Sequence, residues 1–151
     1  MAAAVAATIA ASVGAPAMAA DPYAIVSAGS FAVTDGTRVD DFGVGLGLSF
    51  AEVGIVDFAV EGVVSATGPS ANFEVTMNAD VTAVRFSNVS IDVGAFAGVE
   101  WFDVGNTSWD NNDWVYGVQA SFGTDVVALR TRVYLEDTSN VTANVGVMFS
   151  F

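Results

Sequence analysis

The sequence predicts an all-β fold of eight antiparallel strands closed into an up-and-down barrel, and three observations lead to this prediction. Eight segments alternate apolar side chains with small or polar ones, which is the period of a β-strand. No segment after residue 19 has the ~20 uninterrupted apolar residues of a membrane helix. The faces opposite the apolar ones carry glycines and charges, so we expect apolar side chains to point outward into lipid. Residues 20–151 are therefore predicted to form a transmembrane β-barrel domain.

Residues 1–19 are expected to form a cleavable signal peptide. They are rich in Ala and Val, carry no charge and end in Ala17-Met18-Ala19, which fits the apolar core and the Ala-x-Ala cleavage site of a secretory signal. A buried helix is the alternative. The stretch lacks the Lys or Arg usual near the start of such a signal, which a true start upstream of Met1 would explain.

Four alternating segments make up the first half of the expected barrel, at residues 23–33, 42–50, 55–67 and 73–86. The first segment is the least clear, because Ala, Ser and Gly occupy both faces. In the second, the apolar face consists of Phe42, Val44, Leu46, Leu48 and Phe50, and the other face of Gly43, Gly45, Gly47 and Ser49. Glycines fit the inside of a narrow barrel, where space is short. In the fourth, the alternation slips from Ala83 onward, which indicates a bulge or the end of the strand.

The second half contains segments at residues 91–102, 114–122, 126–136 and 141–151. Tight turns are expected at 51–54, 87–90 and 123–125, and the other connections, at 34–41, 68–72, 103–113 and 137–140, include longer ones. Short periplasmic turns and longer outer loops are typical when both termini face the periplasm. Aromatic residues gather at the outer strand ends (Phe42, Phe73, Trp101, Trp114) and at the inner ends (Phe50, Phe86, Phe122, Phe149, Phe151). Such a pair of belts favours two membrane interfaces over the core of a soluble protein.

The closing segment carries the most specific motif of the chain. Asn144, Gly146, Phe149 and Phe151 resemble the C-terminal assembly signal of bacterial outer-membrane barrels. With the eight segments, the chain from about residue 23 onward resembles the small eight-stranded outer-membrane barrels, such as the OmpA transmembrane domain, OmpX and opacity-type surface proteins. The resemblance implies a bacterial outer-membrane protein surrounded by lipid and inserted by the barrel assembly machinery, and we expect a monomer.

Charged residues of the segments lie mainly on the inward face. Near the middle of the barrel we expect a mutually neutralising interior network of Glu61, Asp80, Arg130 and Arg132. Other acids are expected nearer the two mouths of the lumen: Asp57 and Asp92 at the periplasmic mouth, and Glu74, Glu100 and Glu136 at the outer one. The family that the chain resembles is similarly plugged by inward charges. In another fold these residues would simply face water.

Several kinds of chemistry are disfavoured. A net charge of −13 and the lack of any Lys argue against nucleic acid as a partner. Barrel enzymes of the resembled architecture rely on a catalytic His, but the chain has neither His nor Cys, so neither an enzyme nor a cofactor is expected. The acidic loop 103–113 presents Trp109, a candidate contact for a lipid headgroup or an unknown extracellular partner. Its oxygens could suit calcium, but EF-hand spacing is missing, so a solvated loop without a metal is favoured.

Two functions remain. The first is a non-catalytic structural or surface-interaction module, adhesion-like, with a plugged interior. The second is a narrow cation-preferring, porin-like channel lined by the acids. An eight-stranded interior is just wide enough to be filled by side chains, which favours the module. A soluble lipid-binding barrel would need apolar residues inside, which the Gly and charge faces contradict.

Overall fold

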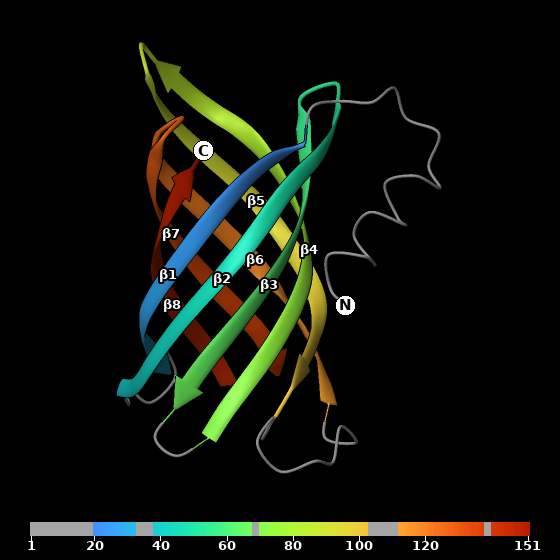
Figure 1. The fold of residues 1–151 in the computed structure, drawn as a ribbon, viewed down its shortest axis with the longest axis vertical. Helices are drawn as coiled ribbons and strands as arrows, with labels where there is room; N and C mark the ends of the chain where they lie inside the picture. The colour runs from blue at the N-terminus through green and yellow to red at the C-terminus, as the bar shows by residue number, and fades with distance from the viewer. Residues whose placement is uncertain (1–19, 33–37, 68–69, 103–111, 138–139) are drawn as a thin grey trace.

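Eight antiparallel strands form a closed barrel in which each strand pairs with its sequence neighbours and β8 pairs with β1 (Figure 1). This is a computed structural model, and it describes residues 20–32, 38–67, 70–102, 112–137 and 140–151. The strands are β1 (Asp21–Ala32), β2 (Arg38–Val53), β3 (Val56–Thr67), β4 (Ser70–Phe86), β5 (Val89–Trp101), β6 (Asn112–Thr124), β7 (Val127–Asp137) and β8 (Asn140–Ser150). The predicted eight-stranded up-and-down barrel is confirmed.

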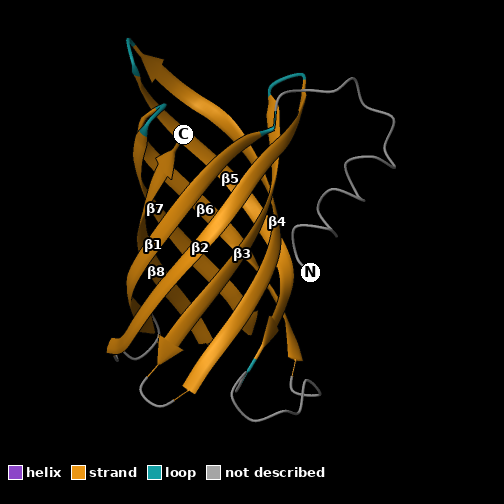
Figure 2. Ribbon diagram, viewed as in Figure 1, coloured by secondary structure: helices purple, strands orange, loops and turns teal. Residues whose placement is uncertain are grey.

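Within these ranges only strands and short turns are found (Figure 2), and none of the described residues belongs to a helix that could span a membrane. The predicted signal peptide, residues 1–19, lies outside the described residues.

The three tight turns lie at the end of the barrel where β1 starts and β8 ends (Figure 1). They consist of residues 54–55, 87–88 and 125–126, so β2 continues three residues beyond its expected end at Phe50. In the first of these turns Gly54 has a φ of 68°, a left-handed conformation that suits glycine. We call this end of the barrel the turn end and the opposite one the loop end.

Bulges keep the apolar side chains outward on the two longest strands, β2 and β4. On β4 the register shifts between Thr82 and Val84, as the slip in the alternation predicted, and Val84 then pairs with Ile91 on β5. On β2 a shift between Ser49 and Ala51 moves the outward row by one residue in the same way, so that Ala51 pairs with Phe58. Without these bulges the apolar rows would turn into the lumen near the turn end.

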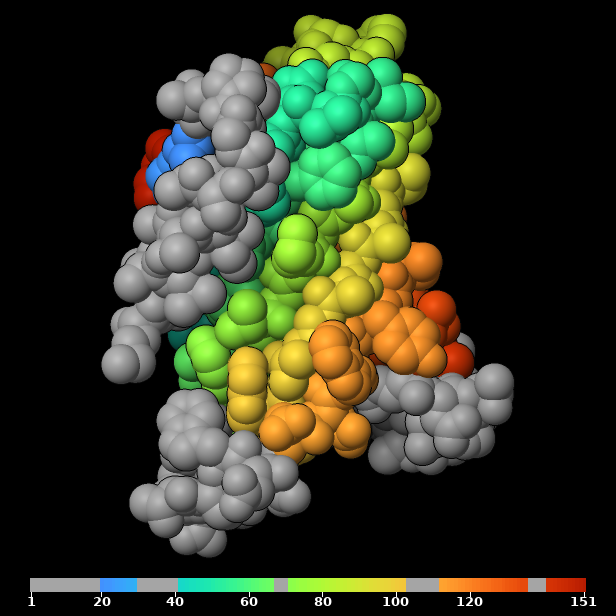
Figure 3. Space-filling model, turned by 90° about the vertical axis from the view of Figure 1, so that its right-hand side faces the viewer, coloured from blue at the N-terminus to red at the C-terminus, as the bar shows by residue number. Residues whose placement is uncertain are grey.

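Outside and inside differ as the alternation predicted. Large apolar side chains cover the outer wall, and Leu46 and Trp114 are 67% and 74% exposed. Most inward positions instead carry polar, charged or small residues, and the buried polar side chains include Glu61, Glu74, Thr76, Asn78, Gln119, Arg130 and Arg132. Figure 3 shows the wall over β2 to β6.

The ambiguous first segment points Tyr23, Ile25 and Ser27 into the lumen, where all three are buried. Tyr23 and Ile25 pack with Ala59 in a small apolar cluster. The ring of Tyr23 lies so close to Gly47 on β2 that a Cβ at this position would clash with it. The glycine face of β2 therefore makes room for an aromatic ring from β1.

Candidate functional site

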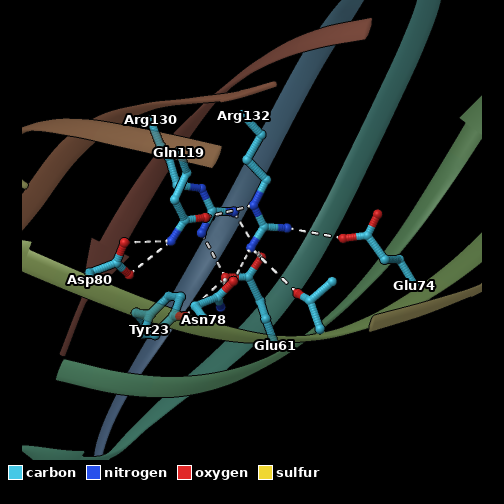
Figure 4. Close-up of polar contacts among 9 residues, drawn as sticks. Tyr23, Glu61, Glu74, Asn78, Asp80, Gln119, Arg130 and Arg132 are labelled. Atoms are coloured by element: carbon cyan, nitrogen blue, oxygen red, sulfur yellow. Dashed lines mark hydrogen bonds and ion pairs between the residues drawn. The ribbon is translucent and has the colours of Figure 1, made fainter. Parts of the chain in front are cut away.

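Glu61 lies at the centre of a polar network that crosses the lumen (Figure 4). Its side chain is fully buried. Arg130 on β7 donates from Nη1 to Glu61 Oε2 at 2.6 Å and from Nη2 to Oε1 at 2.8 Å. Arg132, two residues along β7, forms a second ion pair with Glu61 Oε1 at 2.9 Å. One acid of β3 is thus clamped by both arginines of β7, in the bidentate geometry that makes such pairs strong.

Neutral side chains complete the coordination of the Glu61 carboxylate. The Tyr23 hydroxyl donates to Oε2 at 2.9 Å, and Asn78 Nδ2 donates to the same oxygen at 3.3 Å. A buried charge is tolerated only when it is paired and hydrogen-bonded. The partners of Glu61 come from β1, β4 and β7, so this one carboxylate joins strands from all around the barrel.

Arg132 extends the network toward the loop end. Its Nη1 donates to Glu74 Oε1 at 3.0 Å, and its Nε donates to Gln119 Oε1 at 2.9 Å. Its Nη2 donates to Asn78 Oδ1 at 2.7 Å and to the Thr76 hydroxyl at 3.4 Å. The guanidinium carbon also lies 4.6 Å from the centroid of the Phe96 ring, within cation–π range. All three guanidinium nitrogens of Arg132 therefore have partners.

The network differs from the expected one in its second acid. Glu74, expected nearer the outer mouth, is buried and pairs with Arg132. Asp80, expected to pair with an arginine, instead accepts two hydrogen bonds of 2.8 Å from the Gln119 amide. Gln119 in turn accepts from Arg132, so Asp80 joins the network through an amide.

Sequence reasoning missed four neutral members of this network, Tyr23, Thr76, Asn78 and Gln119. Thr76, Asn78 and Gln119 lie at inward positions of segments with clear alternation, so their amide and hydroxyl groups could have indicated hydrogen bonds to the charges in the lumen. Tyr23 lies in the ambiguous first segment, which gave no such signal.

The remaining acids lie toward the two mouths. Near the turn end, Asp92 accepts hydrogen bonds from the hydroxyls of Thr82 (2.7 Å), Ser90 (2.9 Å) and Ser121 (3.2 Å). Asp57 stands opposite Glu52 on one side and Asp80 on the other, so like charges are direct neighbours there. Trp109 and the side chain of Glu136 lie outside the described residues.

On the loop side of the network the lumen contains a cavity of about 110 Å³. Its lining includes Glu74, Glu100, Arg130, Arg132, Tyr134 and Asn144. A polar space of this size holds several water molecules. The network therefore forms the floor of a polar vestibule that lies toward the loop end and has room for water.

In the predicted assembly signal, Asn144 and Gly146 face Arg132 and Arg130 across the β7–β8 ladder. Phe149 pairs with Ala24 on β1 and is 42% exposed, and Phe151 is 76% exposed at the end of the chain. These residues thus lie at the seam that closes the barrel. Their part in assembly stays a prediction.

Ionic and hydrogen-bonding chemistry is what this site offers. Among the described residues no group of three acids could hold a metal ion. The inward groups are carboxylates, amides, hydroxyls and two guanidiniums that are already engaged. Such an arrangement can close a lumen and hold strands in register.

Comparison with known proteins supports the fold. No family model matches the chain, and no curated protein matches it by sequence. The crystal structure of Neisserial surface protein A (NspA) is similar, with a TM-score of 0.60, 14% identity, and coverage of 91% of this chain and all of the other. A de novo designed transmembrane β-barrel gives a TM-score of 0.54 at 13% identity, covering 90% of this chain and all of the design. The solution NMR structure of the designed protein TMB2.3 gives 0.56 at 16% identity, covering 86% and 93%. The chain therefore has the fold of a small eight-stranded barrel.

Proposed function

We propose that the protein is a non-catalytic barrel of the bacterial outer membrane, a structural or surface-interaction module whose lumen is closed by side chains. The observation that carries this proposal is the network of Glu61, Glu74, Arg130 and Arg132 across the lumen. To pass this level, an ion would have to separate charge-assisted hydrogen bonds in a narrow, buried space.

The outer wall supports the membrane location. On β5 the outward row runs from Ile91 to Trp101, ten residue steps along the strand. At about 3.3 Å per residue and a tilt of about 40°, this row is about 25 Å tall, the height of the apolar band of outer-membrane barrels. Phe73 and Trp101 stack at its loop end, with ring centroids 5.7 Å apart, where an aromatic belt belongs.

The expected orientation and biogenesis follow from the same proposal. The turn end would face the periplasm and the loop end the outside. The predicted signal peptide would direct export, and the closing strand would be read by the barrel assembly machinery.

A narrow cation-preferring channel is the second candidate, favoured by one observation. The two arginines in the lumen bind Glu61 and Glu74, whereas Asp57, Asp80 and Asp92 add further negative charge to the interior. Acid-lined pores attract cations.

Single-channel recording in planar bilayers tests the two candidates. If the lumen is closed by side chains, the wild-type protein gives no conductance steps, whereas Glu61→Ala combined with Arg132→Ala opens a conducting path. Asp57→Asn, near the turn-end mouth, is the matched control and leaves the closed protein silent. Regular cation-selective steps from the wild type that lose selectivity in Asp57→Asn would instead establish the channel.

A further inference from the structure

The β4–β5 hairpin extends past the rest of the wall at the turn end (Figure 1). Pairing between β3 and β4 ends at Val56 and Val81, yet β4 continues to Phe86 and stays paired with β5. Among the described residues, nothing pairs with residues 82–86 from the β3 side. About half of the backbone N–H and C=O groups of this stretch therefore point to an open edge.

This open edge carries exposed apolar side chains. Val84 and Phe86 project outward from it and are 55% and 82% exposed. At the foot of the edge, the β2–β3 turn adds Val53 and Ile55, which are 65% and 75% exposed. Both hairpins lie at the turn end, with the β2–β3 turn and the tip of the β4–β5 hairpin on opposite sides of it (Figure 1). Exposed apolar side chains beside an open strand edge mark an interaction surface.

Phe86 was expected in the aromatic belt of this end of the barrel, but the hydrocarbon of the membrane does not account for the open edge on which it lies. Unpaired backbone groups are not tolerated in the hydrocarbon region. The open edge begins level with Asp92 and Ile91, at the turn-end limit of the apolar band, so it must lie at the membrane interface and beyond it. A partner that covers both features must offer backbone hydrogen bonds together with apolar side chains at alternate positions. An added β-strand does both.

The charges around the edge select a basic partner. At the turn end the described acidic side chains are Asp21, Glu52, Asp57, Asp92 and Asp125, against one arginine, Arg85. Arg85 lies 4.0 Å from Asp125, and both side chains are mostly exposed. A strand beside residues 82–86 would continue the line of β3 beyond the Glu52–Asp57 pair. Its inward neighbour on β4 is Arg85, whose guanidinium lies beside Asp125, so the surplus of acids at this end surrounds the added strand.

We propose that the open edge of β4, residues 82–86, is a docking site for an extended basic segment of a partner protein. The segment adds as a strand beside β4, sets apolar side chains against Val84 and Phe86, and turns Lys or Arg toward the acidic rim. This inference goes beyond the proposed function; the exclusion of lipid and a periplasmic location of the partner rest on the membrane location and orientation proposed there.

A synthetic peptide of alternating Lys and Val residues is the probe, added to the full-length barrel in detergent micelles. Fluorescence anisotropy measures its affinity, and hydrogen exchange follows the amides of residues 82–86. We expect binding that protects these amides. Val84→Ser combined with Phe86→Ser should weaken binding at least about tenfold, from the apolar area that each side chain buries. Val126→Ser is the matched control, because this apolar side chain in the β6–β7 turn has an exposure between those of Val84 and Phe86, and it should change the affinity less than about twofold.

Two peptide controls test the geometry and the charge. In an extended peptide, alternate amide N–H groups point to opposite edges. N-methylation of the amides on one edge should abolish binding, whereas N-methylation of the amides on the other edge should not. A Glu–Val peptide of the same length should bind at least about tenfold more weakly.

The proposal is overturned if the Lys–Val peptide does not bind, or if it binds without protecting residues 82–86. Protection that arises from raising the barrel concentration alone would assign the edge to a second copy. Shielding of Phe86 by lipid in nanodiscs, measured with a water-soluble quencher of a Trp placed there, would assign it to the bilayer. Either result also overturns the proposal.

Discussion

Replacing Arg132 by Met tests how the lumen network is held together. The Arg132 side chain is 3% exposed and donates hydrogen bonds to Glu74, Gln119 and Asn78. The substitution keeps much of the side-chain volume but removes the cation, so Glu74 loses its ion pair inside the barrel. Breaking one side of a buried ion pair costs about 3–5 kcal/mol. Glu61 keeps its bidentate pair with Arg130, so the loss should fall mainly on Glu74.

A double-mutant cycle assigns that loss to its partner. Glu74→Gln in the Arg132→Met background removes the uncompensated charge and should recover about 1–3 kcal/mol, the coupling energy of directly interacting groups. Asp80→Asn is the matched control, because Asp80 reaches Arg132 only through the Gln119 amide. Its coupling to Arg132 should be no more than about 0.5 kcal/mol, the lower limit for members of one network.

Urea unfolding in lipid vesicles, followed by tryptophan fluorescence and gel mobility, supplies the four free energies of each cycle. Additive losses for Arg132→Met and Glu74→Gln would refute the view that the two side chains form a buried pair. A larger coupling energy of Arg132 with Asp80 than with Glu74 would refute the pairing of Arg132 with Glu74. It would favour the pairing of Asp80 with an arginine that the sequence predicted.

Three further predictions concern the wall and the closing strand. Gly47→Ala should destabilise the barrel by about 1–3 kcal/mol because its Cβ meets the ring of Tyr23, whereas Gly62→Ala, with ordinary contacts, should cost less than about 0.5 kcal/mol by the same unfolding assay. Phe149→Ala combined with Phe151→Ala should slow or prevent insertion, measured as the folded fraction over time, and normal assembly would remove the closing motif from the reasoning. The wild-type protein should need detergent and migrate differently on gels before and after heating, and a protein that stays in solution without detergent would contradict the membrane location.

Alternation predicted most of the barrel because it depends on a local rule. On β5 and β6, successive side chains point to opposite faces, and a wall with lipid on one side and a narrow lumen on the other leaves little ambiguity. The bulge at Ala83 was visible for the same reason, since it breaks the alternation. The bulge near Phe50 was not, because Phe50 and Ala51 are both apolar and fit either face.

The partners of the lumen charges depend on features that alternation does not contain. Which acid meets Arg132 depends on the stagger of the strands and on the reach of a long side chain across the lumen. Arg132 reaches Glu74, toward the loop end, while Gln119 occupies the space between Arg132 and Asp80. The sequence thus indicated that both arginines share the lumen with Glu61, but not that Arg132 pairs with Glu74 instead of Asp80.

The placement of these charges ties the network to closure of the barrel. The acids of the network stand on β3 and β4 and its arginines on β7. Glu61 and Arg130 are 69 positions apart in the sequence, and Glu74 and Arg132 are 58 positions apart. In an open sheet β3 and β7 would lie four strand spacings apart, about 19 Å at 4.8 Å per strand, too far for an ion pair. The pairs can therefore form only when the sheet has curved until β3 and β7 face each other across the lumen. It follows that the network stabilises the closed barrel against an open sheet. Strand pairing in the wall and ion pairing in the lumen therefore favour the same final register.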